Sequence, residues 1–195
     1  SCRQVGKKSN HALNYMMGIN TFSLTSGLSL EESERARSLY LHAYKRLPQW
    51  WEEVRTSLAK SHAVINIVGR PRKFLGTVDD KLVKEAVAHL PQSASVWVVN
   101  QAMAKIYEQD HEAEILGQVH DSLLFQHNYS DLGKLAEFSK LAKKALEPQL
   151  TSYGDGVERK FYIETDIKVG FDGAKMYEAT LSNIEETVEN LCKLK

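Results

Sequence analysis

The sequence has few cysteines, no long apolar run and no excess of charge of either sign. No apolar run approaches the roughly 20 residues that a membrane helix needs, and residues 1–12 lack the apolar stretch of a secretory signal. Cys2 and Cys192 match no metal or disulfide spacing. We therefore expect a protein without a membrane span, with free thiols in a reducing compartment.

The net charge of zero argues against a simple basic nucleic-acid binder, but the charge is unevenly distributed. Residues 1–76 hold 12 Lys and Arg against 5 Asp and Glu, a net +7, whereas residues 77–195 hold 13 against 20, a net −7. A basic segment can meet phosphates, although uneven charge is also common in proteins that bind none. With 43% hydrophobic and 26% charged residues, the composition is that of an ordinary globular protein or a large part of one.

Hydrophobic periodicity predicts a mostly helical α+β fold with a few antiparallel strands. The helices are expected over residues 4–18, 30–46, 49–62, 79–89, 92–108, 131–147 and 174–194, with a loop over 18–29. The strands are expected over residues 63–68, 115–120, 122–128 and 161–171. Ser29 and Glu32 form a capping-box pair, and Ser130 is the expected N-cap of the helix that ends before Pro148.

Four residues at regular intervals of four form the first candidate site. On a helix, Arg3, Lys7, His11 and Tyr15 lie along one stripe. Such a row of donors suits a triphosphate, and the tyrosine at its end can stack on a base. Taken alone, the pattern more often describes a solvated basic face that ends in a core tyrosine.

Two further patterns offer contacts for nucleic acid, and neither is specific by itself. In GRPRKF, Arg70 and Arg72 flank a proline in a turn, where they can hold a phosphate backbone or simply face water. In LPQSAS, Gln92 begins a helix and carries the donor and acceptor needed to read base edges in a minor groove.

The stretch QVHD lies between two apolar strands, which predicts a tight hairpin with His120 and Asp121 at its tip. Asp121 can ligate a hard cation such as Mg²⁺ through oxygen, and His120 can reach a phosphate. Aspartate is also a common turn residue, so the hairpin alone leaves both interpretations open.

Taken in order, these patterns resemble the motifs of family A DNA polymerases, the group of bacterial polymerase I and T7-like phage enzymes. The resemblance runs from Arg3 to about Met176, and QVHD is its most specific element. It implies that helix 3–18 is the fingers' nucleotide-binding helix. Arg3 and Lys7 would grip the triphosphate, His11 would lie beside the sugar and base, and Tyr15 would lie at the templating base.

The resemblance also implies roles on the duplex and in the palm. The implied DNA-contacting residues are Arg70, Arg72, Gln92, Gln118 and His120. Asp121 is the implied metal ligand, and the implied catalytic residues are Asp121, His120 and Lys7. The implied cofactor is a pair of Mg²⁺ ions, and the implied partners are primer–template DNA and dNTPs, without a membrane.

Several positions depart from the family pattern. His11 replaces an aromatic residue, so ribose discrimination does not carry over, and Met16 replaces a glycine. Ser122 stands where a second carboxylate often follows the hairpin aspartate. Ala88 and Lys84 stand where the family often has asparagine and arginine.

The second carboxylate-bearing palm strand, a D-Y-S-x-I/L-E-like motif upstream of the fingers helix, is absent from these 195 residues. Two-metal phosphoryl transfer uses carboxylates from both strands. We therefore expect the C-terminal part of a polymerase that transfers nucleotides from dNTPs to a primer 3′-OH. It should be inactive alone and completed by a separate N-terminal half that shares the two Mg²⁺ ions. The alternative is a non-catalytic polymerase relic that acts as a DNA-binding or assembly module.

The expected divisions are fingers over residues 1–76, a palm part over 77–176 with the His-Asp hairpin at 114–128, and a helical extension over 177–195. The resemblance implies a phage or bacterial replication or repair enzyme in the cytoplasm. Loss of an initiator methionine before Ser1 is the simpler explanation of the N-terminal residue, and an intein junction is the alternative.

Overall fold

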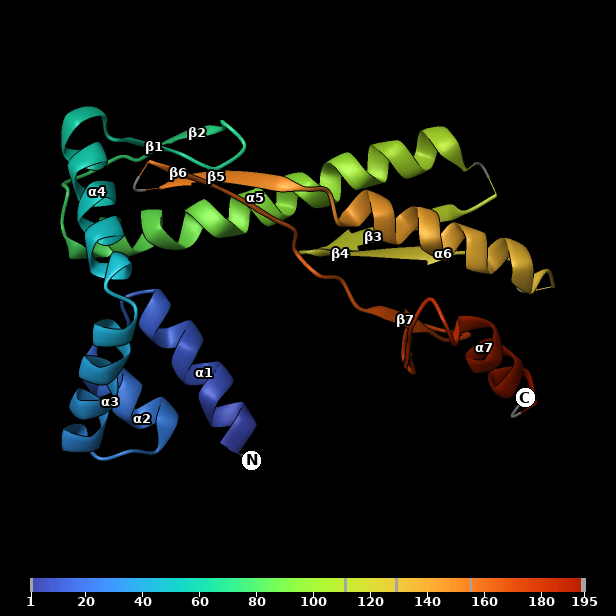
Figure 1. Cartoon of the computed structure of the whole chain (residues 1–195), viewed down its shortest axis with the longest axis horizontal. Coiled ribbons are helices and arrows are strands. Elements are labelled where there is room, and N and C mark those ends of the chain that lie inside the picture. Colours follow the sequence, from blue (N-terminus) through green and yellow to red (C-terminus); the bar gives the residue numbers. More distant parts are fainter. Residues whose placement is uncertain (1, 111, 129, 155, 194–195) are drawn as a thin grey trace. The chain divides into compact units, whose positions relative to one another are not determined.

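The computed structural model describes residues 2–110, 112–128, 130–154 and 156–193, and for residues 2–5 it describes the backbone only. The helices are α1 (Cys2–Asn14), α2 (Ile19–Ser26), α3 (Leu30–Ala43), α4 (Arg46–Ser61), α5 (Asp80–Gln109), α6 (Leu132–Leu146) and α7 (Ile184–Lys193). The strands are β1 (Ala63–Ile65), β2 (Pro71–Lys73), β3 (Glu114–Val119), β4 (Ser122–Gln126), β5 (Leu150–Gly154), β6 (Val157–Phe161), β7 (Ile167–Val169) and β8 (Tyr177–Ala179). Successive strands pair as separate antiparallel hairpins (Figure 1). The predicted mostly helical α+β class is confirmed.

The chain forms two compact units, residues 1–92 and 93–195. The first holds α1–α4, the β1–β2 hairpin and the beginning of α5, and the second holds the remaining elements. Each unit has buried apolar clusters of its own. The expected division into fingers, palm part and extension stays a prediction.

The core of the first unit joins α4 and α5 to the β1–β2 hairpin. Its buried residues are Val54, Leu58, Val64, Phe74, Val83, Ala86 and Val87. The chain just after α1 joins this core, because Tyr15 and Met16 pack against it. Trp51 of α4 also donates its indole N–H to the Asn14 carbonyl oxygen at 3.2 Å. The C-terminal end of α1 is therefore anchored to the core beside the hairpin.

Residues 18–29 were expected to be a loop, but they contain α2. Phe22 is 1% exposed and gives this helix a buried anchor. Thr25 donates its hydroxyl to the Thr21 carbonyl oxygen at 2.9 Å, so a hydroxyl that can compete with a helix instead bonds within it. Gly27 ends the helix with φ of 76°, the left-handed conformation that favours glycine. Burial thus outweighs the Gly/Ser/Thr composition from which a loop was inferred.

The predicted capping box is confirmed at the start of α3. The Ser29 hydroxyl accepts the Glu32 N–H at 3.2 Å, and the Glu32 carboxylate accepts the Ser29 N–H at 2.9 Å. These reciprocal bonds satisfy two backbone donors that the helix leaves open.

The two helices expected over residues 79–89 and 92–108 are one helix, α5, with Pro91 inside it. Proline in a helix interior costs about 3 kcal/mol, which led to the expected break. Buried residues on both sides, among them Val87 and Val98, favour continuation. Apolar burial on this scale offsets the cost of the proline.

The second unit is built on the β3–β4 hairpin and α6. Val119 pairs with Ser122, so His120 and Asp121 form the two-residue tip that was predicted. Phe125 of β4 and Phe138 of α6 pack edge to face with ring centroids 5.2 Å apart. The N-cap of α6 is Asp131 and not the expected Ser130.

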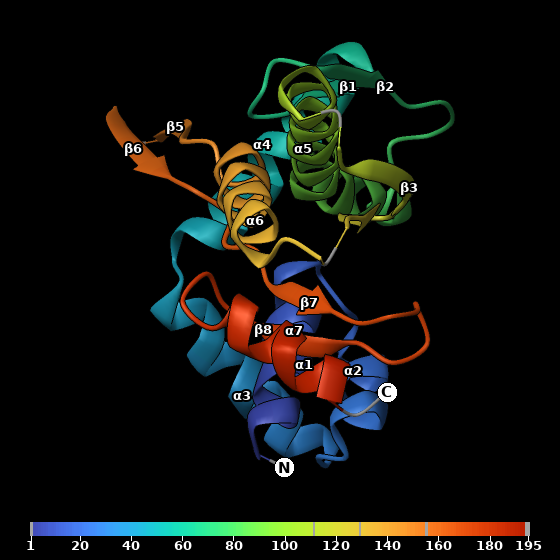
Figure 2. The same cartoon turned by 90° about the vertical axis from the view of Figure 1, so that its right-hand side faces the viewer.

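The C-terminal region differs most from the sequence-based expectation. Residues 161–171 do not form one strand, because β6 ends at Phe161 and β7 begins at Ile167. The helix expected over 174–194 is confined to α7, and β8 precedes it, paired with β7. Figure 2 shows β7, β8 and α7 gathered together. Between β8 and α7, the Asn183 side-chain oxygen accepts the Thr180 N–H at 2.6 Å and the Thr180 hydroxyl at 2.9 Å, and this turn separates the strand from the helix.

Candidate functional site

Lys7 and His11 of the predicted stripe lie on α1, whereas Tyr15 follows the end of the helix at Asn14, earlier than the expected end at residue 18. Lys7 and His11 are exposed, and Tyr15 is half-buried. The His11 and Tyr15 rings meet edge to face, with centroids 4.6 Å apart. Arg3 lies in α1, but its side chain is outside the description. The described part of the stripe therefore offers a cation, an imidazole and a phenol in a row.

Met16 follows this stripe with φ of 57°. This left-handed conformation costs a residue with a Cβ about 1–2 kcal/mol, and glycine avoids the cost. The geometry gives a physical reason for the glycine expected at this position. In this chain, packing of the Met16 side chain against the core partly offsets the strain.

A buried asparagine fixes the turn between β1 and β2. Asn66 is 4% exposed, and its side-chain oxygen accepts the N–H groups of Val68 at 3.1 Å and Arg70 at 2.9 Å. The Asn66 N–H donates to the Arg70 carbonyl oxygen at 3.0 Å. These bonds hold the turn with Arg70 exposed at its end. Sequence reasoning found Arg70 and missed Asn66, although an asparagine three residues before Gly69 is a recognisable turn signal.

Arg72 of β2 is already engaged by three neighbours. Its guanidinium bonds the Glu85 carboxylate at 2.5 Å and the His89 Nδ1 at 3.1 Å, both on α5. It also lies over the Phe74 ring, 4.6 Å from the ring centroid. Sequence reasoning missed Glu85 and His89, whose spacing of four on a helix was the available signal.

The environment of His89 disfavours its protonated form. Partial burial lowers the pKa of His89 below its ordinary value of 6.5, and the Arg72 charge lowers it further. The Glu85 carboxylate acts in the opposite direction and does not reverse the shift. Gln92, one turn further along α5, is exposed.

The hairpin tip presents its polar groups to solvent. Gln118, His120 and Asp121 are exposed, and the Gln118 side-chain N–H donates to the His120 carbonyl oxygen at 3.4 Å. His120 has φ of 53°. The Ser122 hydroxyl donates to the Val119 carbonyl oxygen at 2.8 Å, and this hydrogen bond spans the two-residue tip. Within the described residues, the Asp121 carboxylate has no hydrogen-bond or ion-pair partner.

A two-ion metal site is not complete among the described residues. No group of three or more His, Cys, Asp or Glu side chains comes together in this part of the chain. Asp121 can contribute one oxygen-donor side chain, whereas a pair of divalent ions needs several. Cys192 is an exposed free thiol, as predicted, and the Cys2 side chain is outside the description.

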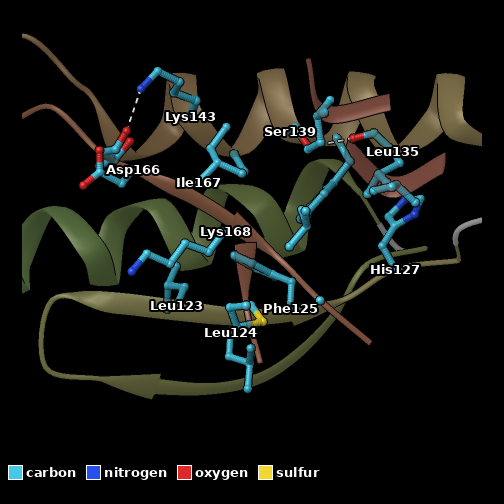
Figure 3. A pocket seen from close by; sticks show the side chains of 18 of the residues that line it. Leu123, Leu124, Phe125, His127, Leu135, Ser139, Lys143, Asp166, Ile167 and Lys168 are labelled. Atoms are coloured by element: carbon cyan, nitrogen blue, oxygen red, sulfur yellow. Dashed lines mark hydrogen bonds between the residues drawn. The ribbon is translucent and has the colours of Figure 1, made fainter. Parts of the chain in front are cut away.

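The second unit also contains an apolar pocket of about 230 Å³ (Figure 3). Its walls come from β4, α6, the β7 region and α7, and they include Leu123, Phe125 and Ile167. Two of its polar side chains are occupied locally: Ser139 donates to the Leu135 carbonyl oxygen at 2.8 Å, and Lys143 to the Thr165 carbonyl oxygen at 2.7 Å. We therefore regard the pocket as apolar packing surface.

The predicted site residues are divided between the two units. Lys7, His11, Tyr15, Arg70, Arg72 and Gln92 belong to the first, and Gln118, His120 and Asp121 to the second. Every helix in the described ranges is too short or too polar to cross a bilayer.

Comparison with known proteins gives a consistent family assignment. A family model described as DNA polymerase family A matches residues 1–171. DNA polymerase I of Helicobacter pylori is 25% identical over 132 residues, which are 64% of this chain and 15% of that protein. DNA polymerase I of Synechocystis sp. is 26% identical over 175 residues, which are 76% of this chain and 17% of that protein.

A solved structure shares the fold. The POL domain of Pol1 from M. smegmatis, in a complex with DNA primer-template and dNTP, aligns with a TM-score of 0.64 at 19% identity. The alignment covers 74% of this chain and 27% of that one. The chain thus spans less than a third of the length of each of these proteins.

Proposed function

The chain belongs to DNA polymerase family A, and we propose that it supplies the nucleotide-binding helix and one metal-binding carboxylate of a template-directed DNA polymerase. The reaction is transfer of a nucleotide from a dNTP to a primer 3′-OH. The observation that carries the proposal is the family match over residues 1–171, which includes both α1 and the His-Asp hairpin tip. By analogy with the family, we place the protein in the cytoplasm of a bacterial host or a phage-infected cell.

The proposed nucleotide site consists of the stripe of α1 and Tyr15, which follows the helix. Arg3 and Lys7 would bind the triphosphate, because cationic donors form strong hydrogen bonds to phosphate oxygens. His11 would lie beside the sugar and base, and Tyr15 beside the templating base. Support comes from the exposure of Lys7 and His11 and from the anchoring of Tyr15 in the core.

The proposed duplex contacts are Arg70, Gln92, Gln118 and His120. All four side chains are exposed, and the Asn66 turn holds Arg70 in place. Arg72 is a weaker candidate for direct contact, because Glu85, His89 and the Phe74 ring already engage its guanidinium.

Asp121 is the proposed metal ligand, with Mg²⁺ as the metal by family membership. The remaining carboxylates would come from a segment outside these 195 residues, since the described residues contain no acidic cluster. Mg²⁺ would supply electrostatic stabilisation of the transferring phosphoryl group. Within this chain, Lys7 and Arg3 would orient the triphosphate and His120 would bind a phosphate of the primer.

Positions that depart from the family pattern favour a second candidate function. A polymerase relic could keep DNA binding and lose catalysis, and His11, Met16 and Ser122 depart from the family pattern in that direction. The two functions differ in dNTP binding, which the relic need not keep.

Two neighbouring lysines on α1 provide a matched test. Lys7 lies on the stripe and Lys8 lies off it, and both are exposed. Binding of a fluorescent dNTP, with primer–template present, should weaken roughly tenfold or more in Lys7→Ala, because a charge-assisted bond is lost. Lys8→Ala removes the same charge and should change binding less than about twofold. Equal effects in the two variants would contradict the assigned stripe. A wild-type chain that binds primer–template but does not bind the dNTP would favour the relic.

A further inference from the structure

The cluster around Arg72 joins two elements of the first unit. Arg72 lies in β2, opposite Val64 of β1, and its partners Glu85 and His89 lie on α5. Two residues before Arg72 is Arg70, at the end of the fixed turn. On α5, Glu85, His89 and Gln92 are spaced by four and three, so they share one helix face. The cluster therefore connects the hairpin that carries Arg70 to the helix face that carries Gln92.

The chemistry of the pair fixes the protonation state of His89. Arginine only donates hydrogen bonds, so the His89 Nδ1 at 3.1 Å must be the acceptor. The ring is therefore neutral, with its proton on Nε2. A second proton would occupy Nδ1, remove the acceptor and place two cations together. Arg72 of β2 and Glu85 of α5 are the charged groups that act on the ring.

The contacts of Arg72 with His89 and Phe74 hold its guanidinium more firmly than the ion pair with Glu85 does. The Arg72 and Glu85 side chains are 41% and 50% exposed, and ion pairs that open to water contribute little. The Phe74 ring beneath the guanidinium is 4% exposed and belongs to the core. Stacking on that ring and bonding to His89 hold the guanidinium in one orientation against α5.

We infer that Arg72 is a positioning residue, which ties the Arg70 turn to the Gln92 face of α5 while His89 is neutral. The inference rests on the proposed DNA contacts of Arg70 and Gln92. It assigns Arg72 no phosphate of its own. The inference also predicts a pH dependence. The Arg72–His89 hydrogen bond is present above the folded pKa of His89, which lies below the ordinary value of 6.5, and it is lost as the pH falls through that pKa.

Salt dependence separates a positioning residue from a direct contact. Arg70→Gln and Arg72→Gln each remove one positive charge, and binding of a labelled primer–template is measured over a series of salt concentrations. Loss of a phosphate contact should reduce the slope of log Kd against log salt by about 0.9 in Arg70→Gln. Arg72→Gln should weaken binding about three- to tenfold with the slope unchanged. A slope reduced as much in Arg72→Gln as in Arg70→Gln would overturn the inference.

The pH dependence has its own variant. His89→Gln keeps an acceptor oxygen for Arg72 and cannot be protonated. Wild type and His89→Gln should bind the duplex equally within about twofold at pH 7.5. As the pH is lowered stepwise from 7.5, the wild type should come to bind roughly three- to tenfold more weakly than the variant once His89 is protonated. Because the other histidines are common to both proteins, their contribution cancels in the ratio. A ratio that does not change with pH would contradict the role of His89.

Failure of the inference can be told apart from failure of the proposed function. If the wild type binds no primer–template at any pH, the proposed DNA contacts fail. The tie is then tested by NMR without DNA: the Arg72 side-chain N–H signals should follow the titration of His89 in the wild type and stay constant in His89→Gln. Arg72 signals that do not change while His89 titrates would contradict the hydrogen bond between Arg72 and His89.

Discussion

At the scale of single residues, His120 carries an unusual backbone conformation. Its φ of 53° lies in the left-handed region, and Asp121 beside it does not share this feature. Two-residue hairpin turns with positive φ at the first central position favour glycine there. Among the described residues, Met16, His62 and His120 are the non-glycine residues with positive φ, and such strained conformations occur at functional sites. This agrees with the proposed phosphate contact of His120.

Replacement of His120 by glycine should separate stability from function. His120→Gly should raise the free energy of unfolding by about 0.5–1 kcal/mol, because relief of strain exceeds the extra entropy of the unfolded glycine. Primer–template binding should weaken about threefold or more as a phosphate contact is lost. Denaturant unfolding and fluorescence anisotropy measure the two effects.

His62 offers a matched control for this prediction. It also has positive φ, 50°, it is exposed at the end of α4, and it has no proposed contact with DNA. His62→Gly should stabilise the chain by a similar amount and leave DNA binding unchanged. The interpretation fails if His120→Gly destabilises the fold, or if both variants bind DNA like the wild type.

Residue spacing was enough to predict some of the candidate site. The stripe of Lys7, His11 and Tyr15 follows from helical period alone, and the hairpin tip follows from two apolar strands around His120 and Asp121. Asn66, Glu85 and His89 were missed for a physical reason. Their roles depend on the pairing of β2 with β1 and on its packing against α5, and residues 69–74 were expected to be a turn.

At the scale of elements, Glu147 joins the end of α6 to the segment before β7. One of its carboxylate oxygens accepts the Lys143 ammonium at 2.6 Å, the Thr165 N–H at 2.7 Å and the Thr165 hydroxyl at 2.9 Å. Burial alone would raise the pKa of Glu147. The hydrogen bonds from Lys143 and Thr165 outweigh burial and lower the pKa below its ordinary value of 4.5.

This joint predicts a defined loss of stability in acid. The folded pKa of Glu147 is depressed, so its contribution is complete above about pH 4.5 and is lost as the pH falls through the folded pKa. Glu147→Gln should lower the free energy of unfolding by about 1–3 kcal/mol at pH 7. The difference between variant and wild type should shrink in acid.

Unfolding measured between about pH 3 and 7 checks this prediction. Glu114→Gln on the exposed strand β3 is a suitable control, and its difference from the wild type should stay near zero at every pH. A constant difference between Glu147→Gln and the wild type over the whole range would contradict the assigned joint.

Elements that depend on residues close together in the sequence were predicted correctly, and elements that depend on burial were not. The Ser29–Glu32 capping box and the two-residue hairpin depend on nearest neighbours, and both are confirmed. The helix α2 depends on burial of Phe22, and the continuity of α5 through Pro91 depends on packing on both sides. The β5–β6 hairpin was missed because it presents mostly exposed residues without a clear apolar alternation.

At the scale of the whole molecule, the residues with proposed roles in the reaction are divided between the two units. The nucleotide-binding stripe belongs to the first unit, and Asp121 belongs to the second. The chain spans 15% and 17% of the two DNA polymerase I proteins to which it is similar. The proposed chemistry therefore uses side chains of each unit together with carboxylates from a further segment.

Primer extension tests this account most directly. The assay compares this chain, a family A polymerase segment with the second palm carboxylate, and their mixture, each with Mg²⁺, dNTPs and primer–template. The account predicts extension in the mixture only, reduced roughly a hundredfold or more by Asp121→Asn and unchanged by the control Glu114→Gln. Extension by a mixture containing Asp121→Asn at the wild-type rate would contradict it.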